Sequence, residues 1–330
     1  MLHETGLWQD VQELPESLAA TLDAREGVAG AARLLGQARR VVASGNGAAY
    51  YVAVALWLAS LEGAGGPEVV AVPSGLLARG AFRWRPGDAL LAVSSSGEFR
   101  DLVEAIDAGA PAPYAAVTAN AGSTLGGRAG ERALVRVLHQ RAVTHTQAFC
   151  GAVAAALAIW AELTSDATLA DALRAVPDEV AASLAATRAW LDSLGELDPA
   201  VAIAFGSGPG WASALEAGLL LKEVAGVPAE GVETREGATS AMMALQPGHL
   251  ALSLPTAADP LLEEAEEICR SRGAIVLRAP SPGRVDRRLA AITSLAPAAA
   301  LSARIGLARG LDVDRPAWTD DYYRVARSTT

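Results

Sequence analysis

The chain has 330 residues, of which 51% are hydrophobic and 19% charged, and a formal net charge of −10. This composition allows a sizeable core and argues against a nucleic-acid partner, which needs a surface of clustered Lys and Arg side chains. The polar first residues and the short alanine-rich runs, such as residues 151–160, predict neither a signal peptide nor a membrane span, which takes about 20 apolar residues.

Short apolar runs alternate with stretches of helical spacing through the first half of the chain. The runs that predict strands are residues 41–44, 69–72, 89–93, 114–118 and 133–137. Turns rich in glycine, serine or asparagine follow several of them, and a long alanine-rich helix is predicted over residues 146–163. Short buried strands separated by helices indicate a parallel sheet with helices on both faces.

The same order of strand, glycine-rich turn and long helix returns in the second half. The predicted strands there are residues 201–205, 249–254 and 274–277, and the predicted helices are residues 169–194, 211–224, 260–272 and 298–309. We therefore expect an α/β protein with an N-terminal segment (1–19), a first domain (20–165), a helical connector (166–194), a second domain (195–315) and a polar tail (316–330).

Three polar turns stand at the carboxyl ends of predicted strands, where open parallel sheets bind ligands. They comprise residues 44–47, 94–97 and 119–123. Glycine lets a ligand approach the backbone, helix N-termini favour anions, and serine hydroxyls add neutral hydrogen-bond donors. The turns therefore indicate a site for a phosphate monoester. The alternative that stays open is that Ser94, Ser95 and Ser96 only cap the following helix.

Lys222 is the single lysine among 27 basic residues. Either a flexible ammonium group is needed at this position, or the residue is a chance survivor of a compositional bias towards arginine. The two cysteines, Cys150 and Cys269, are far apart in the sequence and have no metal-type spacing. They predict two reduced thiols in a cytoplasmic protein and no metal site.

Several motifs occur in the order typical of one family. VSSSGEF (residues 93–99) resembles the I-S-Q-S-G-E-T phosphate loop of sugar isomerase (SIS) domains, VVASGNGAAYYVA resembles their first strand and turn, and AVTHTQAF their V-A-S-T-K-A-F segment. ALEAGLLLKEVAGVPAEGVETREGATSA is similar to the A-L-E-G-A-L-K-L-K-E and G-E-L-K-H-G-P motifs in the isomerase half of glucosamine-6-phosphate synthase. GLDVDRPAW resembles the G-x-D-V-D-x-P near that family's C-terminus, so the resemblance covers nearly the entire chain.

This resemblance implies two tandem SIS domains, each a parallel sheet flanked by helices in a three-layer, flavodoxin-like arrangement. It implies a small phosphorylated sugar as the ligand, no cofactor, and a homodimer whose site lies at or near the interface between protomers. The phosphosugar-binding residues that it implies are Ser44, Gly45, Asn46, Gly47, Ser94, Ser95, Ser96, Gly97 and Thr146.

The resemblance also assigns a base. Glu223 matches the glutamate that moves a proton between C1 and C2 of the sugar, and Lys222 precedes it. Three positions depart from the family: Phe99 replaces a phosphate-binding threonine, Gly47 a common serine, and Leu220 a lysine.

The family's ring-opening histidine and tail lysine are missing. The histidine position is Glu236 or Thr239, depending on the alignment, and we prefer Glu236; the lysine position falls near Asp321. The side chains that could substitute are Glu236, His145, His249, Tyr322 and Tyr323, each of which also has a plain structural explanation. Glu236 and His145 are the preferred substitutes, because both lie inside segments that match the family and both can carry a proton.

Two functions stay open. The first is an enzyme acting on a sugar or amino-sugar 6-phosphate (an isomerase, deaminase or deglycase) with Glu223 as the base for proton transfer at C1 and C2. The second is a non-catalytic phosphosugar-binding sensor module, which the missing histidine and lysine favour. A Rossmann-type nucleotide site is not expected, because GNGAAY lacks the third glycine of G-x-G-x-x-G.

Overall fold

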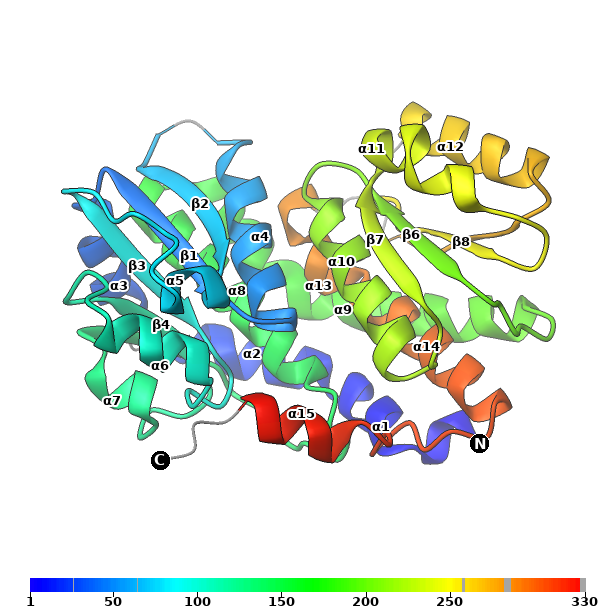
Figure 1. Ribbon diagram of the computed structural model, residues 1–330, viewed down its shortest axis with the longest axis horizontal. Helices are drawn as coiled ribbons and strands as arrows, with labels where there is room; N and C mark the ends of the chain where they lie inside the picture. The colour runs from blue at the N-terminus through cyan, green and yellow to red at the C-terminus, as the bar shows by residue number, and fades with distance from the viewer. Residues whose placement is uncertain (26, 64, 257–258, 282–285, 327–330) are drawn as a thin grey trace. The chain divides into compact units, whose positions relative to one another are not determined.

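The computed structural model describes residues 1–330 except 26, 64, 257–258, 282–285 and 327–330 (Figure 1). The chain forms two compact units, each built on one parallel sheet. The first-sheet unit comprises Glu16–Leu138, Gln147–Arg174 and Trp318–Thr330. The second-sheet unit comprises Met1–Pro15, His139–Thr146 and Ala175–Ala317. Residues 139–146, which lie within the predicted first domain (20–165), belong to the second-sheet unit.

The first sheet has the strand order β2-β1-β3-β4-β5, and all its strand pairs are parallel. The strands are β1 (Arg40–Gly45), β2 (Glu68–Pro73), β3 (Asp88–Val93), β4 (Ala115–Thr118) and β5 (Glu131–Leu134). The fifth strand was predicted over residues 133–137 and lies earlier in the chain. Its first two residues, Glu131 and Arg132, pair with β4 although they are charged, which an edge strand tolerates and an apolar pattern does not reveal.

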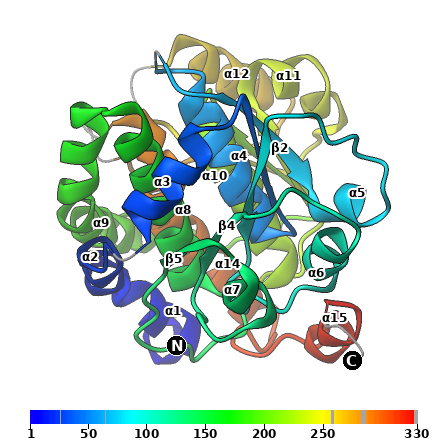
Figure 2. The ribbon, with the colours of Figure 1, turned by 90° about the vertical axis from the view of Figure 1, so that its left-hand side faces the viewer.

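Helices cover both faces of this sheet (Figure 2). The helices α3 (Val28–Gly36) and α4 (Ala48–Ser60) pack on one face, and α5 (Ser74–Ala78) and α6 (Arg100–Asp107) pack on the other. Buried side chains such as Val42, Leu90 and Leu102 fill the core between the sheet and α5–α6. The unit also holds α7 (Thr124–Arg128), most of α2 (Leu14–Asp23) and α8 (Thr146–Thr164), and the start of α9 (Ala167–Ser193).

The predicted polar tail contains a helix, α15 (Thr319–Ala326). The sequence pattern missed it because α15 is short and mostly polar. Its charges nevertheless suit a helix, because Asp320 and Asp321 lie in the first turn and Arg324 in the last.

The second sheet has the order β7-β6-β8-β9 and is also parallel. Its strands are β6 (Ala202–Gly206), β7 (Ala229–Glu233), β8 (Leu250–Ser253) and β9 (Ile275–Arg278). β7 was not predicted, because its sequence AEGVE carries two glutamates and one glycine on an edge strand. The predicted α/β class, with parallel sheets flanked by helices, is confirmed.

The second-sheet unit holds the rest of α9 together with further helices. They are α1 (Gly6–Gln12), α10 (Gly210–Glu223), α11 (Thr234–Thr239), α12 (Pro260–Ser271), α13 (Ala290–Thr293), α14 (Leu295–Ala308) and the 3-10 turns Leu2–Glu4, Ala241–Ala244 and Arg287–Leu289. The closing helix was predicted over residues 298–309 and begins three residues earlier, at Leu295. α10 packs on β6 and β7 and against α13 and α14.

Two helical stretches, Thr146–Thr164 and Arg287–Ala308, are long and apolar enough to cross a membrane by length and composition. The alanine-rich run at residues 151–160 lies inside the first of these stretches, a 19-residue helix. In an apolar 18-residue part of each stretch, 83% and 94% of the residues are buried, as expected of core helices.

Glycines hold α10 unusually close to β7. A Cβ on Gly231 of β7 would lie 2.1 Å from the carbonyl oxygen of Ala214, and a Cβ on Gly218 of α10 would lie 2.8 Å from the backbone nitrogen of Gly231. These neighbours are backbone atoms, which have no rotamer through which to move away. The contact therefore fixes the position of α10 and of its last residue, Glu223.

Gly231→Ala is expected to lower the free energy of unfolding by about 3 kcal/mol, at the upper end of overpacking costs. Urea denaturation followed by circular dichroism measures the change. Gly195→Ala is the control, because no atom lies within 4 Å of a Cβ at that position. Equal stability of the two variants would contradict the close packing of α10 on β7.

A buried ion pair joins β1 to β3. The Arg40 guanidinium donates to both carboxylate oxygens of Asp88 at 3.0 and 2.6 Å, and the side chains are 11% and 2% exposed. The guanidinium also lies over the ring of Phe82, 5.2 Å from its centroid. Burial favours the neutral acid, but Arg40 and the Arg85 backbone N–H outweigh it and lower the pKa of Asp88.

Asp88→Asn is expected to destabilise the protein by about 3 kcal/mol, because it leaves the Arg40 charge buried without a partner. Asp107→Asn is the matched control: its pair with Arg128 is exposed and should contribute less than about 1 kcal/mol. Since the folded state lowers the pKa of Asp88, the stabilisation is present above about pH 4 and is lost as the pH falls below that value. Urea titrations of both variants between pH 7 and pH 3 test both statements.

Candidate functional site

The first sheet has its topological switch point between β1 and β3. Ser44 of β1 pairs with Ala92 of β3, so the turns that follow these strands leave the same edge side by side. One turn carries Gly45, Asn46 and Gly47, and the other runs from Ser94 to Gly97. In doubly wound sheets this is the place where ligands bind. The structure thus brings together the predicted phosphosugar-binding residues of the first-sheet unit.

The serine turn is held by its own hydroxyls. Ser94 Oγ accepts a hydrogen bond from the Gly97 N–H at 3.1 Å, and Ser96 Oγ accepts one from the Glu98 N–H at 3.2 Å. The helix that follows, α6, starts from Phe99 with no side-chain cap. Ser94 and Ser96 therefore stabilise the turn rather than cap α6, and each keeps an O–H group that can donate a hydrogen bond.

The backbone carbonyls of the serine turn are tied to the loop after β4. The Ser95 carbonyl accepts from the Ala119 N–H at 3.1 Å and from the Thr118 hydroxyl at 3.2 Å, and the Gly97 carbonyl accepts from the Leu125 N–H at 3.0 Å. These bonds fix the backbone of the turn. Among the described residues, the N–H group of Ser96 meets no acceptor.

Two glycines have left-handed backbone at this edge. Gly97 has φ +68° and a Cβ there would lie 1.9 Å from Ser123 Oγ, so no other residue fits. Gly47 has φ +53° and is the N-cap of α4, again with no side-chain cap. Both α4 and α6 therefore begin with backbone N–H groups that no side chain caps, which is the arrangement that favours an anion.

Two buried hydroxyls lie at the same edge. In the part of the chain that the structure describes, Ser44 Oγ and Ser74 Oγ have no hydrogen-bond partner, and both residues are fully buried. Buried hydroxyls are normally paired, so each is a candidate donor to a ligand. Ser74 was missed as a site residue, although its place directly after the strand at residues 69–72 was a usable signal.

The candidate base, Glu223, is the last residue of α10. Burial raises its pKa to about 7, while the charge of Lys222 acts in the opposite direction. Lys222 itself is exposed. Seven residues before Glu223, Glu216 is only 4% exposed, and sequence reasoning did not select it.

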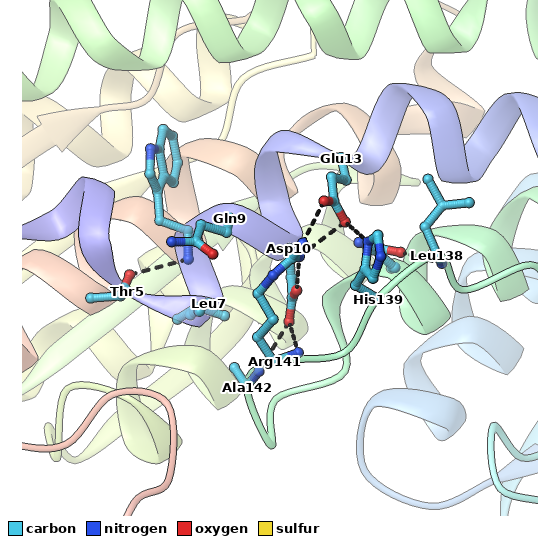
Figure 3. A network of polar contacts seen from close by, with 12 residues as sticks. Thr5, Leu7, Gln9, Asp10, Glu13, Leu138, His139, Arg141 and Ala142 are labelled. Carbon is cyan, nitrogen blue, oxygen red and sulfur yellow. Dashed lines mark hydrogen bonds and ion pairs between the residues drawn. The ribbon is translucent and has the colours of Figure 1, made fainter.

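His145 belongs to residues 139–146, which a polar network fixes onto α1 (Figure 3). The Asp10 carboxylate, 2% exposed, accepts from the backbone N–H groups of Arg141 and Ala142 at 2.7 and 3.0 Å and from the Arg141 guanidinium at 2.8 Å. Glu13 binds the same guanidinium at 2.7 and 3.0 Å and the His139 ring at 3.0 Å. Glu13 and Asp10 together raise the pKa of Arg141.

The GLDVDRP motif has a structural role in the same unit. The Asp314 carboxylate accepts from the N–H groups of Gly6 and Leu7 at 2.8 and 2.7 Å, and so caps the start of α1. The Asp314 carbonyl accepts from the Val143 N–H at 2.8 Å. The motif therefore ties the N-terminal helix to the segment that carries His145.

His145 is half-buried, and burial lowers its pKa although the charge of Asp10 acts against this. The imidazole is therefore neutral at neutral pH and can accept a proton. The flanking hydroxyls of Thr144 and Thr146 are buried and have no hydrogen-bond partner among the described residues. They are candidate ligand contacts beside the histidine.

The other candidates lie on α11, before β8 and on α15. Glu236 is exposed on α11 and accepts from the Ser240 hydroxyl at 3.2 Å, and Thr239 is exposed at the end of the same helix. His249 precedes β8, at the amino end of the second sheet. Tyr322 and Tyr323 stack edge to face on α15, where Asp321 pairs with Arg324. Across the described ranges no three His, Cys, Asp or Glu side chains are placed to hold a metal ion.

No protein-family model matches the sequence, and no curated protein matches it either. Solved structures do match. The C-terminal domain of glucosamine-fructose-6-phosphate aminotransferase from Francisella tularensis has a TM-score of 0.80 at 17% identity, covering 94% of this chain and 98% of that one. Tagatose-6-phosphate ketose/aldose isomerase from Escherichia coli has a TM-score of 0.78 at 18% identity, covering 96% of both chains.

A third match is glucosamine-6-phosphate deaminase from Thermotoga maritima, with a TM-score of 0.74 at 17% identity over 95% of this chain and 98% of that one. These structures are similar along almost the whole chain although few residues are identical. The chain therefore has the α/β fold of the phosphosugar isomerase and SIS-domain proteins, with two parallel sheets flanked by helices.

Proposed function

We propose that this protein binds a phosphorylated sugar at the carboxyl edge of the first sheet and transfers a proton between C1 and C2 of that sugar. The observation that carries the proposal is the pair of turns after β1 and β3. There, two helix starts without side-chain caps meet at the switch point, together with the Ser44 hydroxyl, which has no partner among the described residues. The structural neighbours act on sugar 6-phosphates by name, which favours the same ligand class here.

A phosphate group suits these turns chemically. Its oxygens accept hydrogen bonds only, and the turns offer hydroxyls, the Ser96 N–H and helix N-termini. The bound group is expected to be the 6-phosphate of a hexose or 2-amino hexose. Ser44, Gly45, Asn46, Gly47 and the residues 94–97 would hold it, and Thr146 would contact the sugar.

Glu223 is the proposed base. A pKa near 7 lies close to the working pH, where a general base is most effective. In the open-chain aldose the carboxylate removes the C2 proton, which gives an enediolate as C1=O becomes C1–O⁻. Return of the proton to C1, with transfer of the O2 proton to O1, gives the ketose, so that no atom or electron is gained or lost. Deaminase and deglycase reactions also begin with proton transfer at C1 or C2.

The second candidate function is a phosphosugar-binding sensor without catalysis. Two replacements favour it. Leu220, at a position where the resemblance expects a lysine, is apolar, and Glu236, at the position of the ring-opening histidine, is exposed to solvent. Lys222 and His145 remain as proton carriers in the enzymatic proposal.

We further expect a cytoplasmic homodimer with the site at or near the protomer interface. Sedimentation at micromolar concentration tests the oligomeric state, and a monomer would contradict the prediction.

Isothermal titration calorimetry tests the binding step. Glucose 6-phosphate and glucosamine 6-phosphate are titrated into the protein, with glucose, glucosamine and inorganic phosphate as comparisons. The proposal expects at least one 6-phosphate to bind at least tenfold more tightly than its free sugar, and inorganic phosphate to compete. Equal binding of sugars with and without phosphate would contradict it.

A further inference from the structure

One stripe of α10 carries polar side chains although the helix is buried nearly all round. Residues 213, 216, 220 and 223 are spaced by three, four and three, which places them on one face of the helix. Three of them are polar: Ser213, Glu216 and Glu223. Ser213 and Glu216 are each 4% exposed. A central helix normally presents apolar residues on such a stripe, so these side chains need a reason.

Glu216 has no partner that could hold a charge. Its Oε2 atom meets no hydrogen-bond partner, and no Lys, Arg or His pairs with it, in the part of the chain that the structure describes. Its neighbours one turn away along α10, Ala212, Leu219 and Leu220, are uncharged. A carboxylate there would lose its hydration without gaining a counter-charge, so the neutral acid is the stable form.

The two glutamates of the stripe lie in different environments. Burial raises the pKa of Glu216 well above its usual range, and the charge of Glu223 raises it further. The pKa of Glu223 is raised only to about 7. Glu216 is almost wholly buried and has no counter-charge among the described residues, so it favours the neutral acid, while Glu223 is only half-buried. Two carboxyl groups in such different environments can supply one acid and one base.

We propose that Glu216 is a neutral carboxylic acid that donates the proton for opening the sugar ring, while Glu223 acts as the base at C2. This inference rests on the proposed function. In the step, the C1–O5 bond breaks, O5 takes the proton of Glu216, and the C1 hydroxyl loses its proton as C1=O forms. That proton passes to water, and water reprotonates Glu216, so the step is balanced.

Leu220 is the apolar neighbour at the position from which a counter-charge could reach Glu216. It is 0% exposed and stands four residues after Glu216, the spacing at which a lysine would form an ion pair with a glutamate. Leu220→Lys would supply that counter-charge and take the proton from Glu216. Together with Glu216→Gln, it gives two independent ways to remove the acid.

Infrared difference spectroscopy at pH 8 tests the protonation state without any substrate. The parent is expected to show the carbonyl stretch of a protonated carboxylic acid. Glu216→Gln removes that band, and Leu220→Lys replaces it with a carboxylate band. Glu230→Gln, which changes an exposed glutamate of β7, is the control and leaves the band in place. A parent spectrum without the band overturns the proposal.

Exchange NMR of the α and β anomers of glucose 6-phosphate and glucosamine 6-phosphate tests whether Glu216 donates the proton for ring opening. The parent should accelerate anomer interconversion, and Glu216→Gln should reduce that acceleration at least about 10²-fold, the lower range for a positioned acid. Glu223→Gln should keep it while losing exchange at C2. Unchanged interconversion in Glu216→Gln, or none in the parent, overturns the donor role.

The outcomes separate this inference from the proposed function. If the parent binds a 6-phosphate and exchanges its C2 proton while Glu216→Gln interconverts anomers normally, only the role of Glu216 fails. If the parent binds no phosphorylated sugar, the proposed function fails as well. Should Glu216→Gln not fold, Leu220→Lys carries both measurements.

Discussion

Glu223→Gln is expected to abolish exchange of the C2 hydrogen of a sugar 6-phosphate in deuterated water. The amide keeps the size and hydrogen bonding of the carboxyl group but cannot take a proton, and positioned bases contribute about 10² to 10⁴ in rate. Binding should change by less than about tenfold, or 1.4 kcal/mol, because the phosphate is held by the turns of the first sheet. Proton NMR gives the exchange rate and calorimetry the affinity.

The pH dependence of C2 exchange by the parent protein is a second test of Glu223 as the base. Since burial raises the pKa of Glu223 to about 7, the exchange rate should rise with pH through about 7 as the carboxylate forms. Glu230→Gln, an exposed glutamate of β7, should behave as the parent. Exchange at the parental rate in Glu223→Gln would place the base elsewhere, with His145 the next candidate.

Ser94→Ala combined with Ser96→Ala is expected to weaken phosphosugar binding by about 3–6 kcal/mol, because hydrogen bonds to a charged group contribute about 1.5–3 kcal/mol each. That loss is about 10²- to 10⁴-fold in affinity. Calorimetry with the 6-phosphate that binds the parent measures it. Unchanged affinity in the double variant would mean that the serines only stabilise their turn.

The single variants separate ligand binding from turn stability. Ser94 Oγ accepts from the buried Gly97 N–H, so Ser94→Ala should also cost about 1–3 kcal/mol of stability. Ser96 is exposed, and Ser96→Ala should weaken binding with little change in stability. Ser60→Ala, at the opposite end of α4 from Gly47, is the control for both measurements.

The turns after β1 and β3 were predictable because their signals are local. Each of β1 and β3 is a short, buried apolar run that stops at glycine or serine, and the carboxyl ends of parallel strands share one edge. The sequence therefore predicted the turns and their ligand class. It did not predict the bonds inside the serine turn, because a hydroxyl that caps a helix and one that folds its own turn have the same sequence.

The parts that were missed depend on distant contacts. β7 pairs with β6 through a sequence that lacks a strand pattern, and it is held there by the close approach of Gly231 to α10. Asp10 binds Arg141 and Ala142, which are 131 and 132 positions away in the chain, so the network that fixes the His145 segment left no local signal. Glu216 was overlooked because its burial is set by the packing of α10, although its place on the stripe with Ser213 and Glu223 was visible.

Loss of the C2 proton signal in the parent protein is the most direct test of a phosphosugar proton-transfer enzyme. Hexose 6-phosphates and their 2-amino derivatives are incubated with the protein in deuterated water and followed by proton NMR. We expect the C2 signal of at least one of them to disappear only when protein is present, and inorganic phosphate to slow its loss. Binding of a 6-phosphate with every C2 signal retained would contradict catalysis and favour the sensor module.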